Sequence, residues 1–423
     1  VSFTNNGTLN ALAGTTTLSA GSWNNTGALN VNGGILNLSG TNGTNTGTFN
    51  LSAGTLNLGG NIATPTLGTF TRSGGLVNIT GTLNNASQIL DIGSAGVFGT
   101  GGINNVSGSI VGGTIISTDG TVLNTSSNPT FSGVTLANAA NPNLTINGGL
   151  IITNGITLAD TAVINKGNGY WYFGGSGTQT LEVAGSGSAI LNNAGGILYG
   201  NYGNTAPTLV LDSGLTVQGY GQIADYYNVS VVNNGTIQAT TTGQTFTISP
   251  VSFTNNGTLN ALAGTLSSNS GFAANSGTVT VAPGASFARS SNASFTNNGN
   301  FLTGGTVNLG TGTFTNNGTL RVGASPGFTT ITGNLVLGTS SIVEMEIAGR
   351  TRGLASVAEP VVHDYGNIEN RDAVLAYDRA EPALDASGQH ALAADLLSLM
   401  EQFNAASDAG LVIPSAYLEI VIT

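Results

Sequence analysis

The amino-acid sequence predicts an all-β solenoid, in which short parallel strands wind into coils that stack along one axis. Two observations carry this prediction. Glycines recur every 20 or 21 residues in two series that keep step with each other: Gly7, Gly27, Gly47 and Gly68, and Gly14, Gly34, Gly54 and Gly75. The segment VSFTNNGTLNALAGT at positions 1–15 returns unchanged at positions 251–265. A stack tolerates such reuse because each coil contacts mainly its two neighbours.

Each repeat contains short alternating runs, such as TLNLGG and LVNITG, which are typical of short strands. A unit of about 20 residues is too short for a propeller blade of about 40 to 45 residues, but it fits one coil of a parallel β-helix. We expect about 17 coils over residues 1–350, with Leu9 and Leu259 inside and turn asparagines stacked in amide ladders. Asn-Asn-Gly segments should form the turns, because Asn and Gly tolerate positive φ.

The middle section, about residues 100–230, is less regular and holds a cluster of aromatic residues. Seven of the ten tyrosines lie between Tyr170 and Tyr227. They define, with one tryptophan, a candidate ligand-binding patch: Tyr170, Trp171, Tyr172, Tyr199, Tyr202, Tyr220, Tyr226 and Tyr227. Such side chains offer amphipathic contact area for sugar rings or for another protein. Alternatively, they fill a wider coil or cover its loops.

The composition changes near Arg350, which predicts two regions, a repeat domain at 1–350 and a charged region at 351–423. Residues 350–423 hold 15 of the 27 charged residues. The segment 385–410 has apolar residues at helical spacing, and it is followed by an alternating strand, AYLEIVIT. Leu418, Ile420 and Ile422 lie on one side of that strand. We expect this strand either to cap the solenoid edge or to pair with a neighbouring molecule.

The charge content excludes several classes of function. Only 6% of the residues are charged, the net charge is -11, and Lys166 is the single lysine. Such a chain lacks the basic field that attracts nucleic acid. It contains no cysteine, which excludes disulfides and thiolate metal sites. No apolar run reaches the length of a transmembrane helix.

An active site is not evident in the sequence, and we expect no cofactor, no metal and no catalysis. The repeat domain holds eight acidic residues, mostly far apart: Asp91, Asp119, Asp160, Glu182, Asp212, Asp225, Glu344 and Glu346. Glycoside hydrolysis needs two carboxylates close together, and Asp212 with Asp225 is the best candidate pair. In the tail, His363, Ser387 and His390 lack the sequence frame of a nucleophile elbow.

The segment GASPGFTTITGNLVLGTSSIVEMEIAG, residues 323–349, resembles the terminal coils of bacterial autotransporter and filamentous-haemagglutinin-like (two-partner secretion) passengers. The upstream FTNNGTLN and GTLNL units extend the resemblance over about 350 residues. It implies a right-handed parallel β-helix that works outside the cell as an adhesin, aggregation factor or matrix component. From Arg350 onward the sequence departs from that pattern, because charged, helical sequence begins there.

We therefore expect an extracellular structural and adhesive protein at the bacterial cell surface. Its partners would be glycans or proteins of host or neighbouring cells, or copies of itself in a filament. The alternative is a β-helix that binds or cleaves polysaccharides.

Overall fold

The computed structural model describes residues 1–138, 143–175, 177–202, 208–224, 230–323 and 329–345, and three later strands. For residues 201, 202 and 345 and the three later strands, it describes the backbone alone. Strands make up 64% of the structure, and the parallel strands stack as a β-solenoid of about 15 turns. This confirms the predicted fold class. The coil number is lower than the 17 expected because middle coils are longer: Thr82 pairs with Ser109 and Val163 with Ile190, 27 residues on in each case.

The chain forms two compact units, Val1–Val229 and Ser230–Thr423. The first (unit 1) contains one 3-10 helix, η1 (Thr64–Thr66), and these strands: β1 (Ser2–Asn5), β2 (Thr8–Ala11), β3 (Thr15–Leu18), β4 (Ser22–Asn25), β5 (Ala28–Leu38), β6 (Asn42–Asn45), β7 (Thr48–Leu58), β8 (Asn61–Ala63), β9 (Thr69–Arg72), β10 (Leu76–Ile79), β11 (Thr82–Asn84), β12 (Ile89–Asp91), β13 (Asn105–Val106), β14 (Ser109–Val111), β15 (Thr114–Ile116), β16 (Leu123–Asn124), β17 (Thr130–Leu136), β18 (Leu144–Asn147), β19 (Leu150–Leu158), β20 (Val163–Lys166), β21 (Tyr170–Gly174), β22 (Gln179–Val183), β23 (Ala189–Tyr202), β24 (Thr208–Leu211) and β25 (Leu215–Ala224).

The second (unit 2) contains η2 (Ser290–Asn292) and these strands: β26 (Ser230–Asn233), β27 (Thr236–Ser249), β28 (Ser252–Asn255), β29 (Thr258–Ser268), β30 (Ala274–Asn275), β31 (Thr278–Val281), β32 (Ser286–Arg289), β33 (Phe295–Asn297), β34 (Asn300–Thr303), β35 (Thr306–Asn316), β36 (Thr319–Val322), β37 (Thr330–Leu337), β38 (Ile342–Met345), β39 (Pro360–Val362), β40 (Leu375–Asp378) and β41 (Val412–Ser415). The part of the chain that the structure describes contains no apolar helix of membrane-spanning length.

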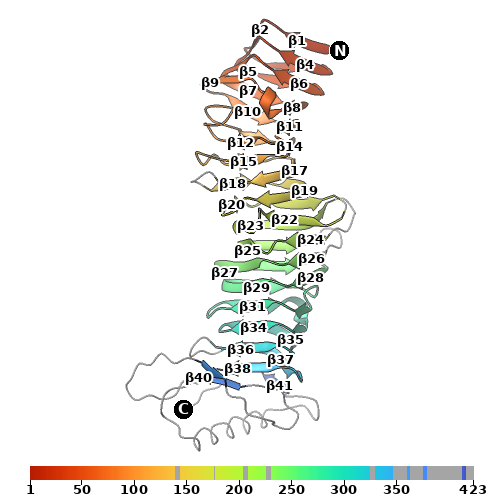
Figure 1. Cartoon of the computed structure of the whole chain (residues 1–423), viewed down its shortest axis with the longest axis vertical. Helices are drawn as coiled ribbons and strands as arrows, with labels where there is room; N and C mark the ends of the chain where they lie inside the picture. Colours follow the sequence, from red (N-terminus) through yellow and green to blue (C-terminus); the bar gives the residue numbers. More distant parts are fainter. Residues whose placement is uncertain are drawn as a thin grey trace, which may run out of the picture. The chain divides into compact units, whose positions relative to one another are not determined.

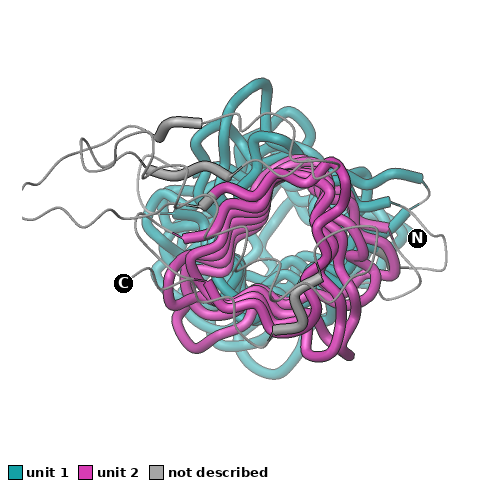
Figure 2. The backbone as a smooth tube through the Cα atoms, turned by 90° about the horizontal axis from the view of Figure 1, so that it is seen from below, with its two compact units in different colours: residues 1–229 teal, residues 230–423 magenta. Residues whose placement is uncertain are grey.

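Parallel pairing places each residue beside its counterpart in the next coil, as the stacked arrows of Figure 1 show for each unit. Leu9 pairs with Leu29 and Leu29 with Phe49, for example, each 20 residues further on. Seen end on, the coils of each unit wind around a common interior (Figure 2). Because side chains alternate along a strand, every second residue of each strand points into that interior, and register partners in successive coils point the same way.

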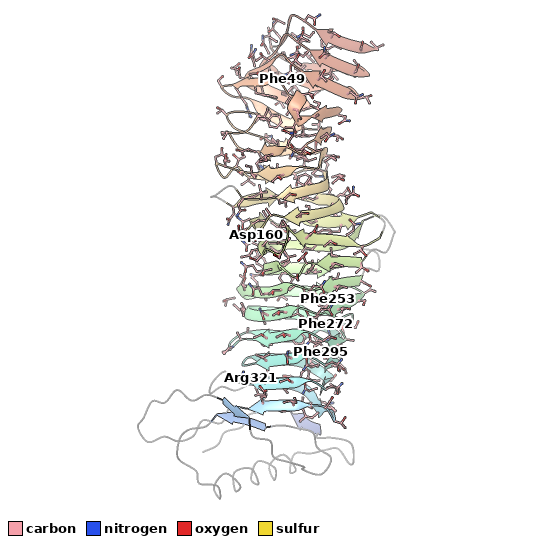
Figure 3. The ribbon with its side chains drawn as sticks, viewed as in Figure 1. Phe49, Asp160, Phe253, Phe272, Phe295 and Arg321 are labelled. Atoms are coloured by element: carbon pink, nitrogen blue, oxygen red, sulfur yellow. The ribbon has the colours of Figure 1, made fainter. Side chains whose placement is uncertain are left out.

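The interior is filled by aliphatic and aromatic side chains stacked from coil to coil. Leu29, Phe49 and Leu259 have no exposed surface. In unit 2 the ring centroids of Phe253 and Phe272 lie 5.1 Å apart, as do those of Phe272 and Phe295 (Figure 3). Burying such a side chain contributes roughly 1.5–3 kcal/mol, so the stacked core stabilises each coil through its neighbours.

Buried asparagines at the turns form the amide ladders that the sequence predicts. In unit 2 each amide nitrogen donates to the amide oxygen of the next coil at 2.8–2.9 Å, along Asn233, Asn255, Asn275, Asn297 and Asn316. In unit 1, Asn5, Asn25 and Asn45 are joined in the same way at 2.6 Å. Except for Asn233 Oδ1, which begins the unit 2 ladder without a hydrogen-bond partner among the described residues, the ladders pair amide groups that would be costly to bury alone.

The turn glycines are required for a different reason from the one the sequence suggests. None of the turn glycines at 27, 47, 257 and 277 has a positive φ. A Cβ on Gly257 would instead lie 2.1 Å from the carbonyl oxygen of Gly235, in the turn of the preceding coil. That oxygen is held in place because it accepts a hydrogen bond from the Thr258 N–H at 2.8 Å. The turns thus stack too closely for any side chain.

The last coil of unit 2 is covered by strands from the C-terminal region. β40 pairs in parallel with β38, whereas β41 pairs antiparallel with β37, with Ile413 beside Leu335. Pro414 lacks the N–H that would extend a sheet, as suits an edge strand. The predicted boundary near Arg350, the helix at 385–410 and the strand with Leu418, Ile420 and Ile422 lie outside the described residues.

The duplicated segment allows a test of the turn-stacking explanation, because Gly7 and Gly257 have the same sequence neighbours. Nothing lies within 4 Å of a Cβ built on Gly7. We expect Gly257→Ala to destabilise unit 2 by about 1–3 kcal/mol through overpacking, while Gly7→Ala changes stability little. Thermal unfolding followed by circular dichroism measures both, and equal melting temperatures for the two variants would contradict the explanation.

Candidate functional site: a tyrosine surface on unit 1

Three tyrosines meet on the outer face of β21 and β23. The ring centroids of Tyr172 and Tyr199 lie 5.1 Å apart with their planes inclined by only 8°. Tyr170 is tilted against both, at 6.0 Å from Tyr172 and 5.7 Å from Tyr199. We call these three residues the tyrosine surface. It presents rings in two orientations to solvent.

Strand alternation determines which aromatic residues face outward. In β21, Trp171 and Phe173 are fully buried, whereas Tyr170 is 47% exposed and Tyr172 is half-buried. Tyr172 and Tyr199 are register partners in adjacent coils, which explains why their rings stack. The sequence places both on the same column once the coil length is known.

The predicted patch is corrected at Trp171, whose side chain packs in the core and offers no surface to a ligand. The alternating pattern Tyr-Trp-Tyr-Phe contained the signal for this. Tyr220 is half-buried on β25, next to Gly195. Tyr202 ends β23, and its side chain is not described. Tyr226 and Tyr227, like Leu418, Ile420 and Ile422, lie outside the described residues.

Lys166 is a buried amine whose position in the core the sequence did not reveal; in the sequence it contributes only to the charge balance. Its side chain is 1% exposed, and its ammonium nitrogen donates to the carbonyl oxygen of Gly169 at 2.6 Å and to Asn193 Oδ1 at 3.1 Å. The nitrogen lies 5.9 Å from the ring centroid of Trp171. Burial lowers the pKa of Lys166 to about 7.

Lys166 begins an interior polar ladder. Its register partner is Ile146 in the preceding coil and Asn193 in the following one. An asparagine here would aim an acceptor at the apolar Ile146, whereas an ammonium group has donors alone. The Asn193 amide then donates onward to the Gly196 carbonyl at 2.9 Å. Lysine therefore suits the first position of a ladder, where the preceding coil offers no hydrogen-bond donor.

Two arginines are held in the same way, by neutral oxygens and not by carboxylates. Arg72 donates to the carbonyl oxygens of Gly74 at 3.1 Å and Gly75 at 2.6 Å. Arg289 is 6% exposed, donates to Ser268 Oγ at 2.9 Å and lies over the ring of Phe295. Burial lowers the pKa of both guanidinium groups, that of Arg289 to about 10. Both guanidinium groups are therefore bound by uncharged oxygen atoms of the coils.

The carboxylates of Asp91 and Asp119 join two neighbouring loops reciprocally. Asp91 accepts the N–H of Thr118 at 3.2 Å and also its hydroxyl hydrogen. Asp119 accepts the N–H of Ser94 at 2.8 Å and that of Thr121 at 3.0 Å. The bond from the Ser94 N–H, followed by those from Thr121, holds the pKa of Asp119 well below its ordinary value. Both carboxylates therefore have a structural task.

Two further carboxylates likewise accept hydrogen bonds from loop N–H groups. Asp160 accepts from Ser188 at 3.0 Å, and Asp212 accepts from Gly214 at 2.9 Å. Asp225, the second member of the candidate pair, lies outside the described residues. Within the described ranges, no three His, Asp or Glu side chains are grouped closely enough to hold a metal ion.

The buried lysine predicts a pH dependence of stability. Its pKa is about 7 in the folded chain and 10.5 as a free side chain. Between these values the unfolded chain binds more protons, so the free energy of unfolding rises with pH, by up to about 1.4 kcal/mol per unit. Below pH 7 the penalty of burying the charge is fully present. Urea unfolding at pH 7.5, 8.5 and 9.5 should show this rise relative to Lys166→Met, and parallel pH profiles would refute it.

No family model matches this chain, and no curated protein and no solved structure matches it significantly.

Proposed function

We propose that this protein is an extracellular structural and adhesive β-solenoid of the bacterial cell surface, either an adhesin-like passenger or a filament subunit. The observation that carries the proposal is the chemistry of the outer faces. Outward asparagines form uncharged ladders, in which Asn30 donates to Asn10 and Asn50 to Asn30, both at 2.7 Å. A second ladder runs along Asn37, Asn57, Asn78 and Asn104.

These ladders support a role in which the protein acts through its extended outer surface and not through catalysis. They repeat the same neutral hydrogen-bonding groups from coil to coil, as a protein that presents an extended contact surface requires. The carboxylates of Asp91, Asp119, Asp160 and Asp212 all accept hydrogen bonds from loop N–H groups. The resemblance of residues 323–349 to exported passengers supports the extracellular location. The fold itself hosts both adhesins and enzymes, so it does not decide between them.

A polysaccharide-binding role is a second candidate, and the tyrosine surface is the observation that favours it. Outward aromatic rings give contact area at a small cost in side-chain entropy. This role is compatible with adhesion, because an adhesin that recognises glycans needs such a surface.

Bead attachment and electron microscopy test the proposal. Beads coated with the purified chain should attach to bacterial or host cells more than beads coated with albumin. Negative-stain images should show discrete particles of one size for a passenger, or long polymers for a filament subunit. An absence of both attachment and polymers, together with release of reducing sugar ends from polysaccharides, would contradict the proposal and favour an enzyme.

A further inference from the structure

One outward column of unit 1 carries tyrosine in two adjacent coils and small polar residues in most of the others. Successive register partners follow the column through adjacent coils: Ser2, Ser22, Asn42, Asn61, Thr82, Ser109, Thr130, Ile151, Tyr172, Tyr199 and Ala224. Seven coils carry a small polar residue there. Parallel pairing is made by the backbone, so a hydroxyl or amide side chain suffices. Strand pairing by itself therefore does not require tyrosine in the two adjacent coils.

The tyrosine surface combines two ring orientations. Tyr172 and Tyr199 are nearly parallel, and Tyr170 is inclined to them by 58° and 53°. A pyranose ring has an apolar C–H face and a rim of hydroxyl groups. The C–H face can lie against an aromatic ring, while hydroxyl groups reach the phenolic oxygens, since tyrosine has an apolar body and a polar tip.

Within the described residues, the register neighbours of the tyrosine surface are uncharged. Its register neighbours are Ile151 on one side and Ile197 and Ala224 on the other. Lys166, the nearest cation along the chain, points into the core. An anionic ligand would find no positive charge among these neighbours, so the surface fits a neutral ligand better than an acidic polysaccharide.

The size of the surface favours a sugar chain over a protein partner. A tyrosine buries about 150–250 Å² when fully covered, and two of the three rings are already half-buried. The three rings can therefore add only a few hundred Å², whereas a stable protein interface takes about 800 Å² from each partner. Two or three sugar units need much less.

We propose that Tyr170, Tyr172 and Tyr199 bind a neutral polysaccharide by stacking against its pyranose rings. This inference rests on the proposed adhesive function and names the chemistry of its ligand. β23, the strand that carries Tyr199, also has an outward amide group that could contribute to sugar binding. Asn192 on β23 donates to Asn165 at 2.8 Å, and amide groups of this kind also bind sugar hydroxyls.

Affinity electrophoresis in native gels tests the proposal. The probes are three neutral polysaccharides, laminarin, dextran and hydroxyethyl cellulose, and one acidic polysaccharide, alginate. At least one neutral probe should retard the unaltered chain, and alginate should not. The double variant Tyr172→Thr, Tyr199→Thr should bind that probe at least about tenfold more weakly, since each lost ring contact is worth about 1 kcal/mol or more.

The column supplies matched controls for this experiment. Threonine already occupies the same outward position at Thr82 and Thr130, so the double variant should keep the circular dichroism spectrum of the parent at the temperature of the gel. The variant Thr82→Ala, Thr130→Ala should be retarded as strongly as the parent. Retardation by alginate alone, by none of the four probes, or equally in the tyrosine variant would overturn the proposal. If bead attachment persisted in those cases, the adhesive function would stand and only this site would fall.

Discussion

Parallel pairing in register, with each residue lying beside its counterpart one coil away, is the constraint on which the rest of the structure depends. Equivalent residues of successive coils therefore form a column, and each of them has to fit the residues before and after it in that column. Inward positions become stacks of apolar side chains. Turn positions become stacks of backbone, and these leave so little room that a Cβ on Gly257 would lie 2.1 Å from a neighbouring carbonyl oxygen.

The same constraint governs polar groups inside the coils. An asparagine can lie between two others because its amide both donates and accepts. A ladder must nevertheless begin somewhere, and Lys166 shows one solution, since an ammonium group needs acceptors alone. The buried cations Lys166 and Arg289 are both bound by neutral oxygens, so the interior holds charge without a carboxylate partner. Their lowered pKa values follow from this burial.

Much of this could be predicted from the sequence, because a period is a property of the chain itself. The glycine spacing predicted the parallel solenoid, and alternation predicted the inward orientation of Leu259. The cause of the glycine requirement could not be predicted, because it lies in the backbone of another coil. The coil number was overestimated because loops lengthen the middle coils. Trp171 was assigned to the candidate patch on composition, although its place between Tyr170 and Tyr172 indicated the core. The burial of Lys166 escaped notice because one of its partners, Asn193, comes from a coil 27 residues away.

Engineered disulfides test the register most directly, since the chain contains no cysteine. Thr258 and Thr278 are register partners on an outward column of unit 2, whereas Thr280 lies two residues further along the same face. Adjacent parallel strands lie about 4.8 Å apart, and a disulfide spans Cα separations of about 4.4–6.8 Å. The pair Thr258→Cys, Thr278→Cys should therefore form a disulfide on mild oxidation, and the pair Thr258→Cys, Thr280→Cys should not. Efficient bridging of the second pair instead of the first would contradict the in-register stack.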